Sequence, residues 1–315
     1  MKKEIFKSIA WKELLLVVIS LIATRIFILN YFYAEFELNP TVSDAEYGLF
    51  ILSVALLFIS ACIANRCFGT KPTAVNTQND PQPTFSNKKQ AKTLFWLLSG
   101  LSVALSFAIG ATKNFFHLGF IFAAAMIALW LYADRCNRQL LSGKIIVSAL
   151  YALLFLLPTV YELFSLIRIP DLFKVIGMDV KQPFRLSLFF ATFAFVLCFL
   201  REIIKDLRDR DNDEEAALKD TFALAFGEKN CKTIACLLAL ILIIATGVYQ
   251  YFYYQHSPAM ILGGISIIVH LPLLYFLKEL RSAQSVQDYD FLAGLLKMLF
   301  VSLLFTMTTA KYILQ

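Results

Sequence analysis

The sequence predicts an all-α protein, a polytopic membrane bundle of about nine transmembrane helices. Of its 315 residues, 59% are hydrophobic and only 17% are charged, whereas about a quarter of the residues in a typical soluble domain are charged. The apolar residues are grouped in runs that approach or exceed the roughly 20 helical residues needed to cross a bilayer. Backbone groups surrounded by lipid must be hydrogen-bonded within their own segment, and this requirement favours helices.

The first apolar run, residues 13–34, follows the basic segment MKKEIFKSIAWK. The run is too long for a signal peptide and no small-residue cleavage site follows it, so we expect a retained span. Arg25 lies inside this run, and an arginine at membrane depth is a candidate functional residue. The alternative is that Arg25 pairs inside the bundle or extends toward an interface.

Eight more apolar runs follow, separated by connections of different lengths. The predicted spans are 48–64, 94–112, 118–134, 145–166, 187–204, 233–254, 259–277 and 291–311. The two longest connections, 65–93 and 201–232, and a shorter one at 133–144 are expected on the inner face. The connection 166–186 is expected to lie along the outer interface as an amphipathic segment. No connection can hold a soluble domain, so 1–315 is predicted to be a single domain.

The distribution of basic residues predicts the orientation of the chain. Lys2, Lys3, Lys7 and Lys12 precede the first span, whereas the first outer connection, AEFELNPTVSDAEYG, has no Lys or Arg. The positive-inside rule therefore predicts a cytoplasmic N-terminus and an external C-terminus, in an integral membrane protein that we expect in a bacterial inner (cell) membrane. The net charge of +6 is therefore interpreted as a signal of membrane orientation, and no nucleic-acid partner is expected.

The stretch REIIKDLRDRDND, residues 201–213, directly follows the sixth apolar run. On a helix, residues three and four apart share a face, so one face would carry Glu202, Asp206, Asp209 and Asp213 and the next Arg201, Lys205 and Arg208. A row of carboxylates repels itself unless a cation lies among them. Magnesium prefers oxygen ligands and often bridges substrate phosphates. The stretch could thus hold a diphosphate through a metal, or its charges could form ion pairs within the helix, such as Asp206 with Arg210.

The same stretch resembles the second aspartate motif of the UbiA family of intramembrane prenyltransferases. REIIKD matches at 201–206, and the later motif positions match at Asp209, Asp213, Thr221 and Gly227. The segment LWLYADRCNRQLLSGKIIVSAL, residues 129–150, is similar to a second family segment. Nine spans with enlarged inner connections are also typical of the family, so the resemblance covers nearly the whole chain.

The resemblance implies a UbiA-like transferase that moves an isoprenoid chain from a polyprenyl diphosphate to a lipid-like or aromatic acceptor. Magnesium bound by two aspartate motifs would grip the diphosphate and stabilise its leaving charge, with the prenyl tail in an apolar cavity. The expected metal ligands and catalytic residues are Asp206, Asp209 and Asp213, with Lys205 and Arg208 near the phosphates. Membrane lipid is a further expected partner. Within the family, the sequence looks closest to bacterial members related to glycerol-phosphate lipid transferases.

The first aspartate motif of the family is degenerate in this chain. Asn65 matches its leading asparagine, but Arg66, Gly69 and Thr73 stand where the family has aspartates. Two magnesium ions need two sets of carboxylates, so at least one metal site is expected to be absent or weak.

Two basic residues stand at positions where the family has other residues. Arg66 replaces an aspartate of the first motif, and Lys144 replaces a family asparagine. We expect them to occupy the space of the missing metal, either pairing with Asp206 and Asp209 or contacting phosphate directly. The alternative is drift at a site no longer used. The chain would then be a catalytically inactive relative that binds isoprenoid lipid or a protein partner.

Overall fold

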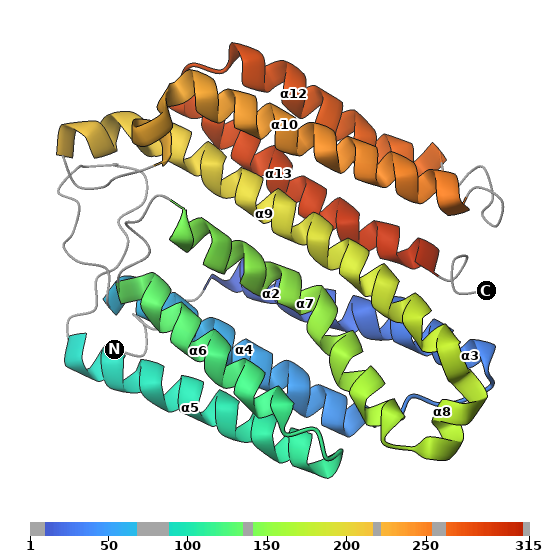
Figure 1. The fold of residues 1–315 in the computed structure, drawn as a ribbon. Coiled ribbons are helices and arrows are strands. Elements are labelled where there is room, and N and C mark those ends of the chain that lie inside the picture. Colours follow the sequence, from blue (N-terminus) through green and yellow to red (C-terminus); the bar gives the residue numbers. More distant parts are fainter. Residues whose placement is uncertain (1–9, 68–87, 135–140, 217–221, 254–262, 311–315) are drawn as a thin grey trace. The chain divides into compact units, whose positions relative to one another are not determined.

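The computed structural model describes residues 10–67, 88–134, 141–216, 222–253 and 263–310 (Figure 1). These residues form helices and contain no β-strand. Within them, nine helices are long and apolar enough to cross a membrane. The prediction of an all-α bundle is therefore confirmed.

Each predicted span overlaps one of the nine helical segments. Their bounds are Trp11–Glu35, Asp44–Asn65, Lys88–Thr112, His117–Asp134, Ser142–Ile167, Lys181–Arg210, Phe222–Tyr251, Gly263–Ser282 and Val286–Ala310. The first segment is built from α2 (Trp11–Thr24), a π-helical turn η1 (Arg25–Asn30) and α3 (Tyr31–Glu35). The predicted outer connection contains a short helix, α8 (Pro170–Ile176), which begins at a proline.

The chain divides into two compact units. Unit 1 consists of Met1–Ile22, Pro40–Asn137 and Val160–Met178, and unit 2 of Ala23–Asn39, Arg138–Thr159 and Asp179–Gln315. The boundary within α7 (Ser142–Ile167) falls one residue after Pro158, which lies inside that helix. The single-domain prediction for 1–315 stays a prediction.

Unit 1 is built around α4 (Asp44–Cys67), α5 (Lys88–Thr112) and α6 (His117–Asp134). Its core contains Phe50, whose ring stacks on Tyr161 and meets Phe122 edge to face. Gly119 lets α6 approach α5, because a Cβ at this position would lie 2.3 Å from the Phe107 ring.

Unit 2 contains α9 (Lys181–Ala216), α10 (Phe222–Tyr253), α12 (Leu271–Ser282) and α13 (Val286–Met307). In Figure 1, α9 lies along both α10 and α13. The part of α7 up to Thr159 runs antiparallel to α9, since Thr159 bonds to Ser187 and Lys144 pairs with Asp206. This pairing of α7 and α9 positions the charged residues described below.

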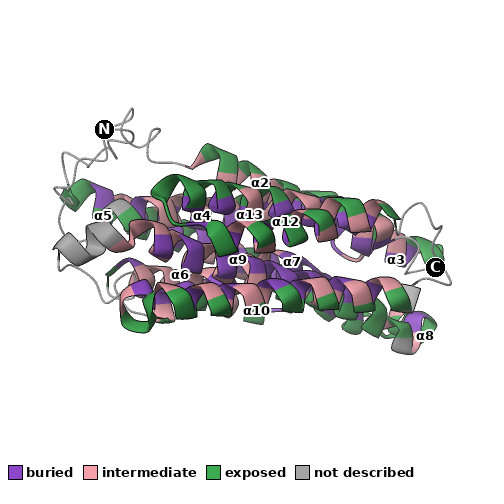
Figure 2. Cartoon of the chain, turned by 90° about the horizontal axis from the view of Figure 1, so that it is seen from above, coloured by how far each residue is buried: buried purple, intermediate pink, exposed green. Residues whose placement is uncertain are grey.

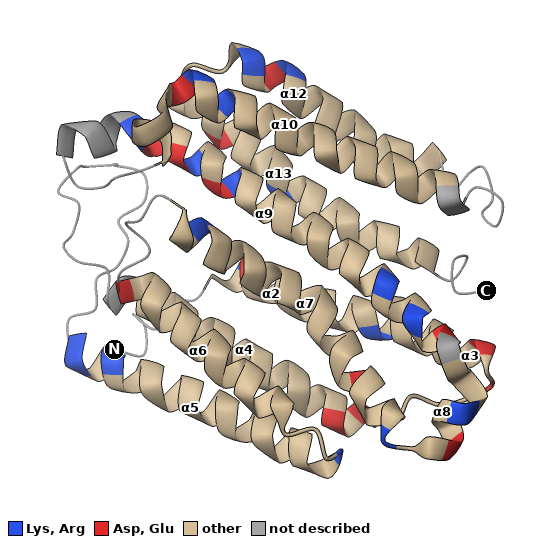
Figure 3. Ribbon diagram, in the orientation of Figure 1, with Lys and Arg blue, Asp and Glu red and all other residues tan. Residues whose placement is uncertain are grey.

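Exposed apolar side chains follow the outer face of α10. Leu237, Ile241, Ile244 and Val248 are each about half exposed and recur at steps of four, three and four, along a helix with many exposed positions (Figure 2). Such a face is stable against lipid and costly against water. Most charged residues of α9, and those of α10 and α12, instead gather at one end of these helices (Figure 3), whereas Lys181 and Arg185 lie at the other end of α9.

The interpretation of 201–232 as a connection is wrong for most of its length. Helix α9 continues to Ala216 and α10 begins at Phe222. The 36 residues of α9 extend to about 54 Å, well beyond the roughly 30 Å of a hydrocarbon core. The polar end of this helix therefore has the composition of a loop but the backbone of a helix.

Candidate functional site

Charged residues at the REIIKD end of α9, together with one lysine from α7, form the candidate site. This Asp206 cluster consists of Lys144, Arg201, Glu202, Lys205, Asp206, Arg208 and Asp209. All seven residues belong to unit 2.

Lys144 and Asp206 form the most buried ion pair of the cluster. Lys144 Nζ lies 2.6 Å from Asp206 Oδ2, and the two side chains are 9% and 19% exposed. The backbone N–H of Phe222 donates to the same oxygen at 3.1 Å, and Lys144 Nζ lies 6.0 Å from the centre of the Phe222 ring. Asp206 therefore joins α7 to the first turn of α10, and Lys144 adopts one of the two arrangements expected from the sequence.

Arg208 holds the next aspartate of the motif. Its Nε and Nη2 atoms donate to the two carboxylate oxygens of Asp209 at 2.7 and 3.1 Å. Its Nη1 atom reaches Asp290 Oδ1 at 3.0 Å and so links α9 to α13. Because the side chains of Asp209 and Asp290 are about half exposed, we expect these pairs to orient Arg208 more than they stabilise the fold.

Arg201 differs from the other cations of the cluster. Lys205 pairs with Glu202 within α9, whereas the Nε atom of Arg201 is buried and no described residue accepts a hydrogen bond from it. Helical spacing predicts Arg201 on the basic face of 201–213, but Arg201 is not among the site residues predicted from the sequence. The signal that could have identified it is its position as the first residue of REIIKD.

A second group of charges, the Glu228 cluster, lies next to the break in α10 at Gly227. Glu228 accepts from Arg210 Nη1 at 2.8 Å and from Tyr289 Oη at 2.9 Å, and Lys232 Nζ lies 2.7 Å from it. These contacts join α9, α10 and α13. By linking three helices at this point, the cluster has a structural role.

The structure brings five of the predicted site residues together in unit 2 (Lys144, Lys205, Asp206, Arg208 and Asp209). Asn65 is exposed near the end of α4 in unit 1. Arg66 and Asp213 lie in described helices, but their side chains are not among the described ones, so their roles stay predictions.

The alternative of ion pairs within the helix holds in part, because Lys205 pairs with Glu202 and Arg208 with Asp209 inside α9, but the Asp206–Arg210 pair is not formed. Asp206 pairs with Lys144 on α7 rather than with Arg210, and Arg210 pairs with Glu228 on α10. Pairs between helices depend on how the helices pack, and spacing along one helix carries no information about that.

The carboxylates of the Asp206 cluster do not fit a magnesium site. Glu202, Asp206 and Asp209 each have a Lys or Arg nitrogen within 2.7 Å of a carboxylate oxygen. Among the residues described, no three His, Cys, Asp or Glu side chains are grouped to hold a metal ion. The magnesium expected from the resemblance stays a prediction, and no chemical step is derived through it.

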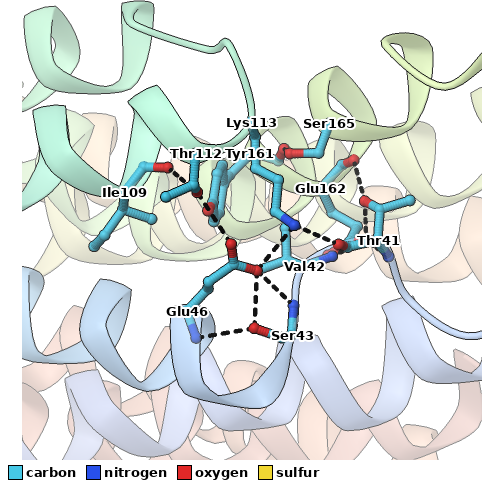
Figure 4. Close-up of polar contacts among 10 residues, drawn as sticks. All are labelled: Thr41, Val42, Ser43, Glu46, Ile109, Thr112, Lys113, Tyr161, Glu162 and Ser165. Carbon is cyan, nitrogen blue, oxygen red and sulfur yellow. Dashed lines mark hydrogen bonds and ion pairs between the residues drawn. The ribbon is translucent and has the colours of Figure 1, made fainter.

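A further polar group, the Glu162 cluster of unit 1, is shown in Figure 4. Glu162 is 1% exposed, and its Oε1 atom accepts from the Thr41 hydroxyl at 2.6 Å and from the backbone N–H of Val42 at 3.1 Å. Lys113 Nζ lies 3.0 Å from Glu46 Oε2 and donates to the Thr41 carbonyl oxygen. These contacts fix the segment that enters α4, so the cluster is structural.

Ser43 and Glu46 complete the Glu162 cluster as a capping box. The Ser43 hydroxyl accepts from the Glu46 N–H at 3.3 Å, and Glu46 Oε2 accepts from the Ser43 N–H at 2.9 Å. The sequence SDAE has the spacing of this motif. This capping signal is readable in the sequence but is not among the predictions made from it.

The fold and the Asp206 cluster define a class: an integral membrane protein built from apolar helices, with a partly buried charged site at one end of a helical unit. Residues 15–304 match the model of the UbiA prenyltransferase family, and the chain therefore belongs to that family. The resemblance inferred from the motifs is confirmed.

Two solved structures share the fold. One, described as giving structural and mechanistic insights into digeranylgeranylglyceryl phosphate synthase in membranes, has a TM-score of 0.62 and 16% identity, covering 98% of this chain and 100% of that one. The other is the apo structure of a UbiA homolog from Aeropyrum pernix K1, with a TM-score of 0.57 and 11% identity, covering 91% and 96%. A comparison with curated protein sequences found no match. At these identities, the structural likeness concerns the fold alone.

Proposed function

We propose that the chain is a membrane prenyltransferase that moves an isoprenoid chain from a polyprenyl diphosphate to a lipid-like or aromatic acceptor. The family match over residues 15–304 is the observation that carries this proposal. The cations gathered in the Asp206 cluster support it, because a diphosphate is the most highly charged part of such a donor.

In this proposal, Arg201 and Lys144 meet the diphosphate. The planar guanidinium of Arg201 presents paired donors that suit phosphate oxygens, and an ammonium such as that of Lys144 acts as a point charge. Negative charge develops on the diphosphate as it leaves, and cations already held in place stabilise it without reorganising. Arg208, fixed by Asp209 and Asp290, would add to the positive potential.

The orientation and location of the chain belong to the same proposal. We place the Asp206 cluster on the cytoplasmic side of a bacterial inner membrane, with the N-terminus inside and the C-terminus outside. The basic residues before the first span and the absence of Lys and Arg from AEFELNPTVSDAEYG support this orientation.

A second function is favoured by the state of the aspartates. Asp206 and Asp209 are occupied by Lys144 and Arg208, and three positions of the first motif have lost their carboxylates. A catalytically inactive relative that binds isoprenoid lipid or a protein partner would tolerate both changes.

Turnover distinguishes the two functions. Purified protein in lipid nanodiscs is given labelled geranylgeranyl diphosphate, magnesium and either a glycerol-phosphate lipid or an aromatic acid as acceptor. The proposal predicts release of diphosphate and a labelled lipid product. Donor binding without product supports the inactive relative, and the absence of both binding and product contradicts the prenyltransferase.

A further inference from the structure

Asp206 is the residue where this chain departs most clearly from a metal site. We propose that the ammonium group of Lys144 takes the place of a divalent cation at Asp206, so that this carboxylate is not a metal ligand. One consequence rests on the proposed function: the donor diphosphate would meet Lys144 directly, with no metal bridging it to Asp206.

The contacts of Asp206 Oδ2 carry this inference. The oxygen faces Lys144 Nζ at 2.6 Å and the Phe222 N–H at 3.1 Å. A magnesium ion binds oxygen at about 2.0–2.1 Å with near-octahedral geometry. To bind this oxygen, the ion would have to displace the ammonium group or lie within a few ångströms of another positive charge.

Burial makes the ammonium difficult to displace. Lys144 is 9% exposed and Asp206 19% exposed in their side chains. Removing one partner of a buried ion pair leaves an uncompensated charge, which is strongly unfavourable. The Phe222 ring, 6.0 Å from Lys144 Nζ, adds a weak attraction for the cation.

The same carboxylate also has a structural task that a metal would disturb. By accepting from the Phe222 N–H, Asp206 satisfies a backbone donor in the first turn of α10, where such donors have no partner within the helix. The pair therefore fixes α7, α9 and α10 together. A metal ion is not needed to hold this end of unit 2.

Manganese binding tests the inference without any donor. Mn²⁺ is titrated into wild-type protein and into Asp206→Asn in detergent, and bound ion is measured from the loss of the free Mn²⁺ signal in electron paramagnetic resonance. Equal binding to the two proteins is the expected result. An extra equivalent bound by wild type and lost in Asp206→Asn would overturn the inference.

A second variant, Lys144→Asn, is expected to gain a response to Mn²⁺, so the inference also predicts a positive result. Lys144→Asn restores the asparagine of the family and exposes the Asp206 carboxylate, so we expect a lower thermal midpoint that Mn²⁺ raises. The double variant Lys144→Asn/Asp206→Asn should lose this Mn²⁺ response. A folded Lys144→Asn protein that responds to Mn²⁺ no more than wild type contradicts the inference. Should Lys144→Asn fail to fold, the Asp206→Asn comparison decides alone.

Both readouts are independent of the donor. A chain that neither binds nor turns over a polyprenyl diphosphate would refute the proposed function. It would leave the manganese result for Asp206 intact.

Discussion

The cations at the REIIKD end of α9 differ in their surroundings. Lys144, Lys205 and Arg208 each form an ion pair with a carboxylate. In contrast, no described residue accepts a hydrogen bond from the buried Nε atom of Arg201. A cation held near membrane depth is costly unless an anion compensates it. Arg201 is therefore the residue on which the proposed donor binding depends most.

Replacing Arg201 with alanine should weaken binding of geranylgeranyl diphosphate. A hydrogen bond to a charged group contributes about 1.5–3 kcal/mol, so the loss should be on the order of 10- to 100-fold in Kd. Equilibrium binding of the labelled donor to protein in nanodiscs measures this loss. Arg281→Ala, which removes an exposed arginine on α12, is the matched control and should bind like wild type. Equal affinity of the Arg201 variant and wild type would remove Arg201 from the site.

Glu162 in unit 1 should matter for stability. Glu162→Gln keeps the shape of the side chain but weakens the charge-assisted bonds to Thr41 and Val42, so the free energy of unfolding should fall by about 1–3 kcal/mol. Chemical unfolding in detergent followed by circular dichroism measures the change. Glu35→Gln, at an exposed glutamate of α3, should have little effect. Similar losses in the two variants would contradict the structural role of Glu162.

At the scale of single residues, composition and motif spacing predicted which residue types matter but not their partners. Lys144 and Asp206 are 62 positions apart in the sequence, and only the antiparallel packing of α7 and α9 brings them together. The contacts of Phe222 and Asp290 with the cluster depend on α10 and α13 in the same way. No periodicity along one helix encodes these contacts.

Helix α10 contains a break in its helical backbone near its start. Gly227 has φ 75° and ψ 157° inside α10, a region open almost only to glycine. The break separates the turn held by Asp206 from the part that begins with Glu228. Both clusters of unit 2 therefore depend on this one backbone conformation.

Gly227→Ala should destabilise the protein through backbone strain alone, because a Cβ there would meet no atom within 4 Å. The expected cost is about 1–3 kcal/mol in the free energy of unfolding. The matched control is Gly247→Ala, at a position of α10 that also has open space for a Cβ and shows no left-handed φ. Thermal unfolding of the two variants gives the comparison. A control as destabilised as Gly227→Ala would show that backbone strain at Gly227 is not the cause.

At the scale of helices, the sequence predicted membrane-buried stretches better than helix ends. Apolar runs identify residues that lie in lipid, and all nine predicted runs overlap helices of the structure. The C-terminal end of α9 and the start of α10 were not predicted to be helical, because the parts of a membrane helix that continue into water are polar. Their composition then matches that of a loop, and ion pairs such as Arg210 with Glu228 stabilise them instead.

For the whole molecule, the proposed topology has an odd number of spans, so it predicts that the two termini lie on opposite sides of the membrane. The basic N-terminal segment predicts which side each occupies. A green fluorescent protein fused to the N-terminus should fluoresce in a bacterial host. The same protein fused to the C-terminus should not fluoresce, because it would be exported. Alkaline phosphatase at the C-terminus should be active. Reporters that place both termini on one side would contradict the nine-span topology, and the opposite pattern would reverse the orientation.

Membership of the UbiA family and the bundle fold could be predicted from REIIKD and the pattern of spans. The partners of the expected metal ligands could not, because Asp206 lies against Lys144 only through the packing of α7 on α9, and Asp209 lies against Arg208. The proposed function depends on one claim: the Asp206 cluster recognises the diphosphate of an isoprenoid donor.

Binding of wild-type protein to geranylgeranyl diphosphate and to geranylgeraniol, measured side by side in nanodiscs, tests that claim directly. The two ligands share the same apolar tail and differ in the diphosphate. The account predicts that the diphosphate binds more tightly, by on the order of tenfold or more in Kd, from phosphate contacts. Equal affinity for the two ligands, or no binding of the diphosphate, would contradict it.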